Sequence, residues 1–196
     1  MNRKKFLLVF LLFFFFGGIS VSWADTYKVD KDHTSVSFKI RHVLSNAQGI
    51  FRDFDGVLEF DPAKPETWSA NGTIQVKSID TNVPERDKHL QSKDFFDVAQ
   101  FPTITFKTTK VSDATKESAK VEGLLTMHGV QKPVVLDVQI HGVAKDPWGN
   151  VRAAFTATTK INRKDFGIVY NQVLDQGQLM VGDEVMVTIE LEGIKA

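Results

Sequence analysis

Apolar and polar residues alternate with a period of two along most of the chain beyond its first two dozen residues. Val36, Phe38 and Ile40 share one parity, and Ser37 and Lys39 share the other. Because successive side chains of a strand point to opposite faces, this pattern predicts strands with one apolar face. The predicted strands span residues 36–42, 54–60, 74–78, 103–108, 121–127, 134–140, 153–157 and 185–191.

Turn-forming residues lie between these strands, at Asp61-Pro62, at His128-Gly129 before Lys132-Pro133, and at 146–150. Short polar helices are expected only near Pro84 to Ser92 and Asn162 to Phe166. Strands in series without a long helical crossover favour an antiparallel meander, and a long sheet tends to close and so remove its edges. A barrel is therefore predicted, although alternation alone leaves a two-sheet sandwich with a solid core equally open.

The first 24 residues have the pattern of a secretory signal peptide. A basic start at Arg3 to Lys5 precedes an apolar run from Phe6 to Phe16, and the small-residue site Ser22-Trp23-Ala24 follows. The 11-residue run is shorter than the ~20 residues of a membrane-spanning helix, which disfavours an uncleaved anchor. We predict cleavage after Ala24 and one domain over residues 25–196.

Charge and cysteine content exclude some classes of function. Without Arg3, Lys4 and Lys5, 21 of the 24 basic residues remain against 24 acidic ones, a net charge of −3. A nucleic-acid-binding protein would instead show a clustered basic excess. The chain has no Cys, so an exported domain of this size must be stable on its hydrophobic core alone.

The apolar positions combine large and small residues. Gly56 lies between Phe54 and Leu58 in the same parity, and Phe155 lies between Ala153 and Ala157. Ten Phe remain beyond the leader, and buried Phe needs no hydrogen-bond partner. This composition fits a dry tunnel, but taken by itself it favours the ordinary alternative, a solid core in which Phe and Gly interdigitate.

The stretch from Ser78 to Phe106 carries a family resemblance, which extends over most of the chain. The segments concerned are Val29-Asp30, His33 to Phe38, His42, Ser78 to Thr81, Arg86 to Leu90, Asp94 to Asp97, Phe101-Pro102, Thr105-Phe106, Gly123 to Thr126, Gly129, Lys132 to Val134, Arg163, Asp165 to Gly167 and Gly182 to Val185. In this order and spacing the chain resembles the YceI-like family.

The resemblance implies an all-β fold, an antiparallel eight-stranded lipocalin-like barrel that holds a long isoprenoid chain. The expected function is non-enzymatic binding, with transport or storage, of a polyisoprenoid such as a quinone precursor or prenyl phosphate in the periplasm. Stress adaptation and isoprenoid-quinone metabolism are both compatible with it. The residues expected to line the tunnel are Val36, Phe38, Ile40, His42, Phe54, Leu58, Ile104, Phe106, Leu125, Leu136 and Phe155.

Four cations are candidates for contact with a polar or phosphorylated head group: Arg86, His89, Lys132 and Arg163. Each also has an ordinary interpretation as a solvated loop charge. The family motif includes Arg86 and His89 without assigning them to a ligand, and they could equally fix the short helix to the barrel.

Catalytic and metal-binding patterns are weak. The five His are scattered without metal-ligand spacing, and no nucleophile elbow or phosphate loop is present. Acidic pairs such as Asp94 and Asp97 more often cap turns than catalyse. We expect no metal, catalytic cofactor or nucleic-acid partner, while transient membrane contact and a homodimer stay compatible with the sequence. The alternatives are a structural or partner-binding envelope protein with a solid core, and a hydrolase dependent on Asp94 or His89.

Overall fold

The computed structural model describes residues 24–175 and 177–196, and strands account for most of them. The strands are β1 (Asp25–Val29), β2 (Ser35–His42), β3 (Ser45–Phe51), β4 (Phe54–Phe60), β5 (Ser69–Gln75), β6 (Ile79–Asp80), β7 (Thr103–Ser112), β8 (Ser118–Met127), β9 (Val130–Lys145), β10 (Val151–Asn162) and β11 (Val181–Lys195). The helices are α1 (Pro84–Leu90) and the 3-10 turns η1 (Pro65–Thr67), η2 (Val76–Ser78) and η3 (Arg163–Phe166).

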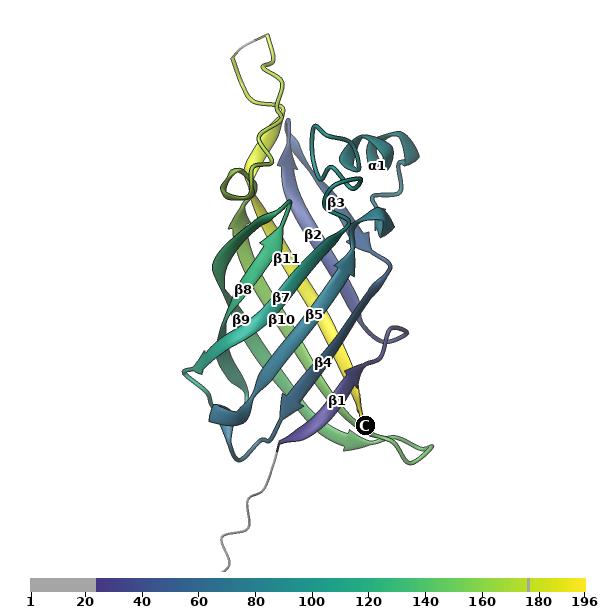
Figure 1. Cartoon of the computed structure of the whole chain (residues 1–196), viewed down its shortest axis with the longest axis vertical. Helices are drawn as coiled ribbons and strands as arrows, with labels where there is room; N and C mark the ends of the chain where they lie inside the picture. Colours follow the sequence, from purple (N-terminus) through teal and green to yellow (C-terminus); the bar gives the residue numbers. More distant parts are fainter. Residues whose placement is uncertain (1–23, 176) are drawn as a thin grey trace, which may run out of the picture.

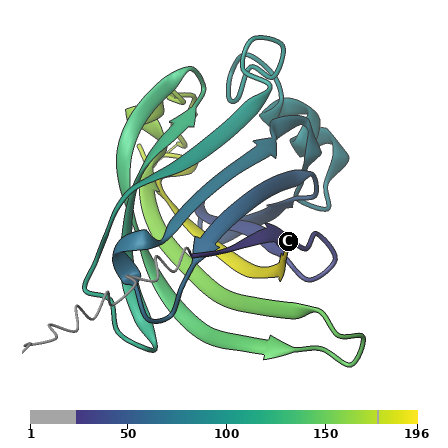
Figure 2. The same cartoon turned by 60° about the horizontal axis from the view of Figure 1, so that its bottom comes forward.

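Eight strands close into a ring, in the order β1-β4-β5-β7-β8-β9-β10-β11, with β1 pairing back onto β11. The closing pairs run from Tyr27 opposite Lys195 to Val29 opposite Gly193. The pairings within the ring are antiparallel. The molecule in Figures 1 and 2 is therefore the predicted antiparallel barrel, and the sandwich is excluded.

The upper part of the barrel, as oriented in Figure 1, is extended by three further strands. β11 pairs with β1 near its C-terminal end and with β2 along its N-terminal part, and β2 continues to β3 and β6. Helix α1 contacts β6 and lies beside this upper end. The wall is thus taller on the side of α1.

Four strands differ from the sequence-based prediction. β1, β3 and β6 were not predicted, because β1 has only five residues, β6 has two, and β3 begins with the polar and small residues Ser-Asn-Ala-Gln-Gly. The strand predicted at 74–78 is wrong in its bounds, since β5 spans Ser69–Gln75 and Val76–Ser78 forms η2. The predicted helices correspond to α1 and η3, and both begin with local signals: Pro84 opens α1, and the Asn162 side chain accepts a hydrogen bond from the Lys164 backbone N–H in η3.

The turn between β8 and β9 contains two residues, His128 and Gly129, with φ of 51° and 74°. Positive φ at both positions is the geometry of a type I′ hairpin, which suits glycine at the second. Lys132 and Pro133, which the sequence placed near this turn, lie inside β9 and pair with Leu125 and Leu124.

The buried apolar residues form two clusters. The upper cluster comprises Val36, Phe51, Phe54, Val76, Ile79, Phe95, Ile104, Met127, Phe166 and Ile168. The lower cluster comprises Tyr27, Phe60, Ala153 and Phe155. Among the described residues, no helix combines the length and the apolar character needed to cross a bilayer. The predicted signal peptide lies, except for Ala24, outside the described residues and stays a prediction.

Candidate functional site

A cavity of about 240 Å³ occupies the interior of the barrel between the two clusters. Its wall includes Phe51 and Phe54 of the upper cluster and Phe60 and Phe155 of the lower cluster, so it extends from one to the other. An apolar cavity of ~150 Å³ already accommodates benzene, whereas drug-sized ligands occupy about 300–1,000 Å³. The bore therefore has room for a slender apolar chain.

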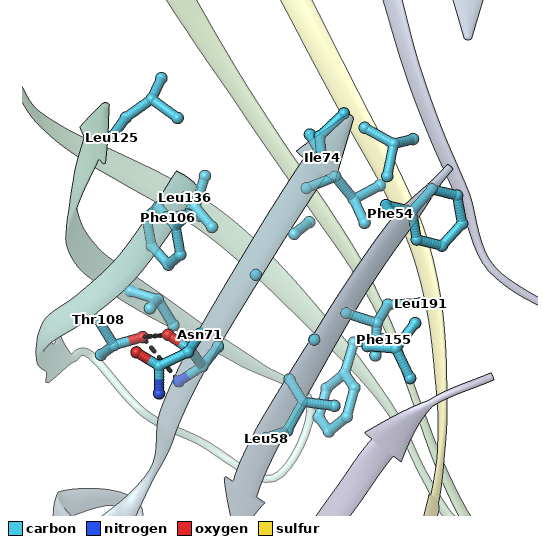
Figure 3. Close-up of a pocket in the computed structure, with 18 of the residues that line it drawn as sticks. Phe54, Leu58, Asn71, Ile74, Phe106, Thr108, Leu125, Leu136, Phe155 and Leu191 are labelled. Carbon is cyan, nitrogen blue, oxygen red and sulfur yellow. Dashed lines mark hydrogen bonds between the residues drawn. The ribbon is translucent and has the colours of Figure 1, made fainter. Parts of the chain in front are cut away.

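Gly72 gives the bore its width on one side. It lies on β5 directly opposite Gly56 of β4, and both have the inward parity of Phe54 and Ile74. A Cβ added at Gly72 would meet only the Asp55 backbone oxygen, at 3.7 Å, whereas a Cβ at Gly56 would lie 3.0 Å from Cγ2 of Val29. Bare backbone thus borders the cavity here, between β4 and β5 in Figure 3.

Gly123 of β8 has the opposite surroundings. A Cβ there would lie 2.3 Å from Cζ of Phe106 and 2.7 Å from the Lys107 backbone oxygen. The ring of Phe106 therefore lies across Gly123 and forms part of the cavity wall. Gly72 therefore leaves open space in the bore, whereas the space beside Gly123 is occupied by the Phe106 ring.

Polar groups at the wall are satisfied by the protein itself. The Thr108 hydroxyl accepts a hydrogen bond from the Ala70 backbone N–H at 2.9 Å and donates to the Ala70 oxygen at 3.2 Å (Figure 3). The backbone pairing of β5 with β7 ends at Asn71 opposite Lys107. At Ala70, the next residue along β5, the Thr108 side chain supplies the hydrogen bonds that a paired strand would otherwise make. Among the described residues, no buried side-chain nitrogen or oxygen lacks a partner.

Nine of the eleven residues expected to line a tunnel border this cavity: Val36, Phe38, Phe54, Leu58, Ile104, Phe106, Leu125, Leu136 and Phe155. Figure 3 labels Phe54, Leu58, Phe106, Leu125, Leu136 and Phe155 of this set around the bore. Whether they contact a lipid stays a prediction, but their common location supports the parity argument.

Ile40 and His42 do not border the cavity. Both have inward parity, yet they lie in the upper half of β2, where Ile40 pairs with Ala47 and His42 with Ser45. Parity identifies the face of a strand, but it does not say how far along the strand the cavity reaches.

The residues missed by the prediction include Gly72, Trp68 and Phe60, all of which border the cavity. Phe60 had a usable signal, since it continues the parity of Phe54 and Leu58. The segment Ser69 to Gly72 had none, because Ser-Ala-Asn-Gly is typical of a turn and not of a strand.

Two of the four candidate head-group cations belong to α1. Nε and Nη2 of Arg86 donate to the Thr81 side chain and backbone oxygen, each at 2.8 Å. Nε2 of His89 lies 2.8 Å from Oδ2 of Asp94, and its ring contacts Phe95 and Tyr170 edge-on at about 5 Å between centroids. Both side chains hold α1 to its neighbours, which supports the alternative that they fix the helix.

Arg163 is buried, with 3% of its surface exposed. Its guanidinium donates to the backbone oxygens of Gly182, Ile168 and Tyr170 at 2.7 to 2.9 Å and pairs with Asp183 at 3.3 Å. Burial lowers the pKa of Arg163, and the Asp183 carboxylate opposes that shift. These contacts are those of a structural residue that ties η3 to β11.

Lys132 is exposed on β9, two residues above the cavity-lining Val134 and with the same inward parity. It pairs across the sheet with Leu125, which also lines the cavity. The described part of the chain offers no hydrogen bond or ion pair to its ammonium group. Of the four candidates, Lys132 alone combines a place near the upper mouth with an uncommitted charge.

One group of side chains has the spacing of metal ligands. Ligand atoms of Asp30, His33 and Glu192 lie within 4.8 Å of one another. Nη1 of Arg152 already donates to both carboxylates, and its Nε pairs with Asp146 at 2.8 Å. Because this guanidinium already pairs with the carboxylates of Asp30 and Glu192, the group is better described as an ion-pair cluster.

Comparison with known proteins agrees with the fold and the sequence pattern. The YceI-like domain model matches residues 27–193. Protein YceI of Salmonella arizonae is 42% identical over 195 residues, covering 98% of each chain. A UPF0312 protein of Pseudomonas savastanoi is 46% identical over 148 residues, covering 74% of this chain and 77% of the relative.

Solved structures show the same architecture. A YCEI protein of Campylobacter jejuni aligns with a TM-score of 0.68 at 37% identity, over 85% of this chain and 96% of that one. BcnA of Burkholderia cenocepacia aligns with a TM-score of 0.73 at 28% identity, covering 84% and 98%. A polyisoprenoid-binding domain from Saccharophagus degradans shares the fold at 13% identity, with a TM-score of 0.65 and coverage of 87% and 98%. The chain belongs to the YceI-like family.

Proposed function

We propose that this protein binds one long-chain polyisoprenoid lipid, holds its tail in the barrel cavity, and carries or stores it in the periplasm. The observation that supports this most is the cavity itself, which runs between the two clusters and is walled by aliphatic and aromatic side chains. A solid-core structural protein would have packed this space at crystal-like density.

The energetics of tail burial are sufficient. At ~0.8 kcal/mol per buried CH₂, a five-carbon isoprene unit contributes about 4 kcal/mol before ordering costs. Two or three buried units therefore match the ~8 kcal/mol of a micromolar complex. The head group would then set orientation more than affinity.

Lys132 is our candidate for the head-group contact, because its ammonium is exposed beside the upper end of the cavity wall. An ammonium group suits a phosphate or a quinone-type oxygen as a point charge. Arg86, His89 and Arg163 bind protein groups in the structure. We assign them to the frame of the site.

The neighbours in sequence and fold are consistent with this proposal. The Saccharophagus domain is described as polyisoprenoid-binding, and it shares the barrel. A quinone precursor or a prenyl phosphate fits the chemistry of an apolar bore with a cation near its mouth. The leader-like residues 1–24 support export.

The direct test is to purify the protein from its native compartment, extract it with organic solvent and identify the extract by mass spectrometry. We expect a polyprenyl species at close to one molecule per chain. Protein that carries no lipid and takes up no polyprenol added in detergent would contradict the proposal.

Gly72→Leu is designed to fill the bore without disturbing the fold, since a side chain at Gly72 enters open space. Lys107→Leu is the matched control, because Lys107 of the neighbouring strand β7 is exposed with outward parity and does not border the cavity. We expect Gly72→Leu to lose bound lipid at an unchanged melting temperature of the empty protein, and Lys107→Leu to retain it. Equal loading of the two variants would refute the cavity as the binding site.

A further inference from the structure

We propose that the upper end of the barrel docks on a lipid bilayer through five exposed aliphatic residues, which we call the apolar tip: Val43, Leu44, Val169, Val173 and Leu179. Their exposed fractions are 36%, 80%, 62%, 71% and 48%. Single exposed aliphatic residues need no explanation, but several on neighbouring loops mark an interaction surface.

Two segments distant in sequence form the tip. Val43 and Leu44 make the turn between β2 and β3, and the other three belong to the segment between η3 and β11. The Val43 backbone N–H donates to the Met180 oxygen at 2.8 Å, which joins the two segments. Val173 pairs with Leu179 in an isolated bridge, so the longer segment is a narrow hairpin that projects above the barrel (Figure 1).

Charge is nearly absent from these segments. Residues 42–51 and 166–181 together contain one Asp, Glu, Lys or Arg, which is Asp175, although such residues make up 24% of the chain. Uncharged polar residues such as Asn171 and Gln178 take their place. Asp175, exposed in the hairpin turn, is therefore the one acidic or basic group of these segments that would have to stay among the lipid head groups. The rest of the tip avoids the desolvation of charge, which is the expensive step for most protein surfaces.

The shape of the tip favours a bilayer over a protein partner. A narrow projection with aliphatic side chains at its end can sink into the boundary between head groups and acyl chains. Arg41 lies at its base and donates from Nε to the Val43 oxygen at 3.0 Å, so its exposed cation would lie at the level of the head groups.

The tip is also connected to the end wall of the cavity. Tyr170, at the base of the hairpin, contacts Phe95 at 5.1 Å between ring centroids. Phe95 belongs to the upper cluster with Phe51 and Phe54, which line the cavity. This inference rests on the proposed function, because a lipid-binding barrel must receive its ligand from a membrane.

The test is flotation of the mature protein with phosphatidylcholine vesicles. We compare wild type with a tip variant that carries Leu44→Asp and Val173→Asp. The control variant carries Val143→Asp and Trp148→Asp at the opposite end of the barrel, where both residues are exposed: Val143 lies near the end of β9, and Trp148 lies in the β9–β10 turn. The tip variant should bind vesicles at least about tenfold more weakly, equivalent to about 1.4 kcal/mol. The control and wild type should bind alike, with little change between about 0.1 and 1 M salt.

Equal flotation of the tip variant and wild type, or no flotation of wild type, would overturn the inference. Loss of binding in the control alone would place the contact at the other end and overturn it too. Uptake of polyprenol from detergent micelles is measured on the same proteins, because it needs no bilayer. Failure of uptake in every protein would count against the proposed function, whereas normal uptake with unchanged flotation of the tip variant would count against the tip alone.

Discussion

Single glycines decide how much of the barrel interior stays empty. Gly72 and Gly123 both have inward parity, yet a Cβ would meet open space at Gly72 and the Phe106 ring at Gly123. The sequence shows that small residues occupy inward positions, but it does not show which of them a neighbouring ring fills. This is why composition alone favoured a solid core over the tunnel.

Gly123→Ala should therefore destabilise the protein by about 1–3 kcal/mol, as overpacking does in other cores. The Phe106 ring or the Lys107 backbone must move to admit the methyl group. Gly72→Ala is the control, and we expect it to be neutral or to stabilise by up to about 1 kcal/mol, because alanine restricts the unfolded chain. Urea unfolding measures both, and equal effects would contradict the difference in surroundings.

Arg163 shows the limit of residue-level inference. Its positive charge made it a head-group candidate, whereas the structure buries it and directs its guanidinium to three backbone oxygens. A sequence does not reveal whether a cation is already bound within its own fold. The same limit applies to Arg86, and it leaves Lys132 as the candidate.

We expect Arg163→Met to lower the free energy of unfolding by about 3–5 kcal/mol, the cost of breaking a buried, hydrogen-bonded charge. Lys164→Met removes the neighbouring contact with Asp183 at an exposed position and should cost less than about 1 kcal/mol. If Arg163→Met instead keeps its stability and loses only lipid affinity, Arg163 is a head-group residue after all.

At the scale of elements, strands with strict alternation were predicted and strands without it were missed. β3 has four polar or small residues before Gly49, and β5 begins with Ser-Ala-Asn-Gly, so neither shows period two at its start. These segments become strands because their neighbours in the sheet supply the pairing. Propensity is overridden there by tertiary context.

The lower end of the barrel is joined by an ion-pair cluster centred on Arg152 of β10. Arg152 contacts Asp30 after β1, Glu192 of β11 and Asp146 in the β9–β10 turn. Hydrogen bonding to Arg152 is the main cause that holds the pKa of Asp30 and of Asp146 below the usual range. The cluster connects the strands that meet where the ring closes.

These folded-state pKa values lie below the unfolded value of about 3.9. The cluster therefore contributes its full stabilisation of the folded state above about pH 3.9, and this contribution is lost as pH falls below that value. Arg152→Met should thus be less stable than wild type at pH 7, by a difference that shrinks below about pH 4. Urea unfolding at several pH values tests this. Lys110→Met, which removes an exposed ion pair with Glu122, is the control and should leave the dependence of stability on pH unchanged. If the stability difference between Arg152→Met and wild type were the same at every pH, the cluster would not be the source of the pH dependence.

For the whole molecule, closure depends on pairing between the two ends of the chain, β1 with β11. No local pattern contains that information, so the barrel was preferred to the sandwich only through the family resemblance. The antiparallel order of the inner strands, by contrast, follows from short connections and could be predicted. The cavity is a property of the closed ring and appears only once the ends meet.

A ligand that fills this cavity must stabilise the ring as a whole, because it binds the folded state alone. Polyprenol at 100 times its dissociation constant adds about 2.7 kcal/mol, and a domain of this size gains roughly 2–4 °C per kcal/mol. We therefore expect the melting temperature of delipidated protein to rise by about 5–10 °C, as measured by calorimetry in detergent with and without polyprenol. Gly72→Leu should show little of this rise while Lys107→Leu shows it in full, since only the first substitution occupies the bore. If the melting temperature rose equally in both variants, the lipid would be stabilising the barrel from outside. The cavity would then not be the lipid-binding site.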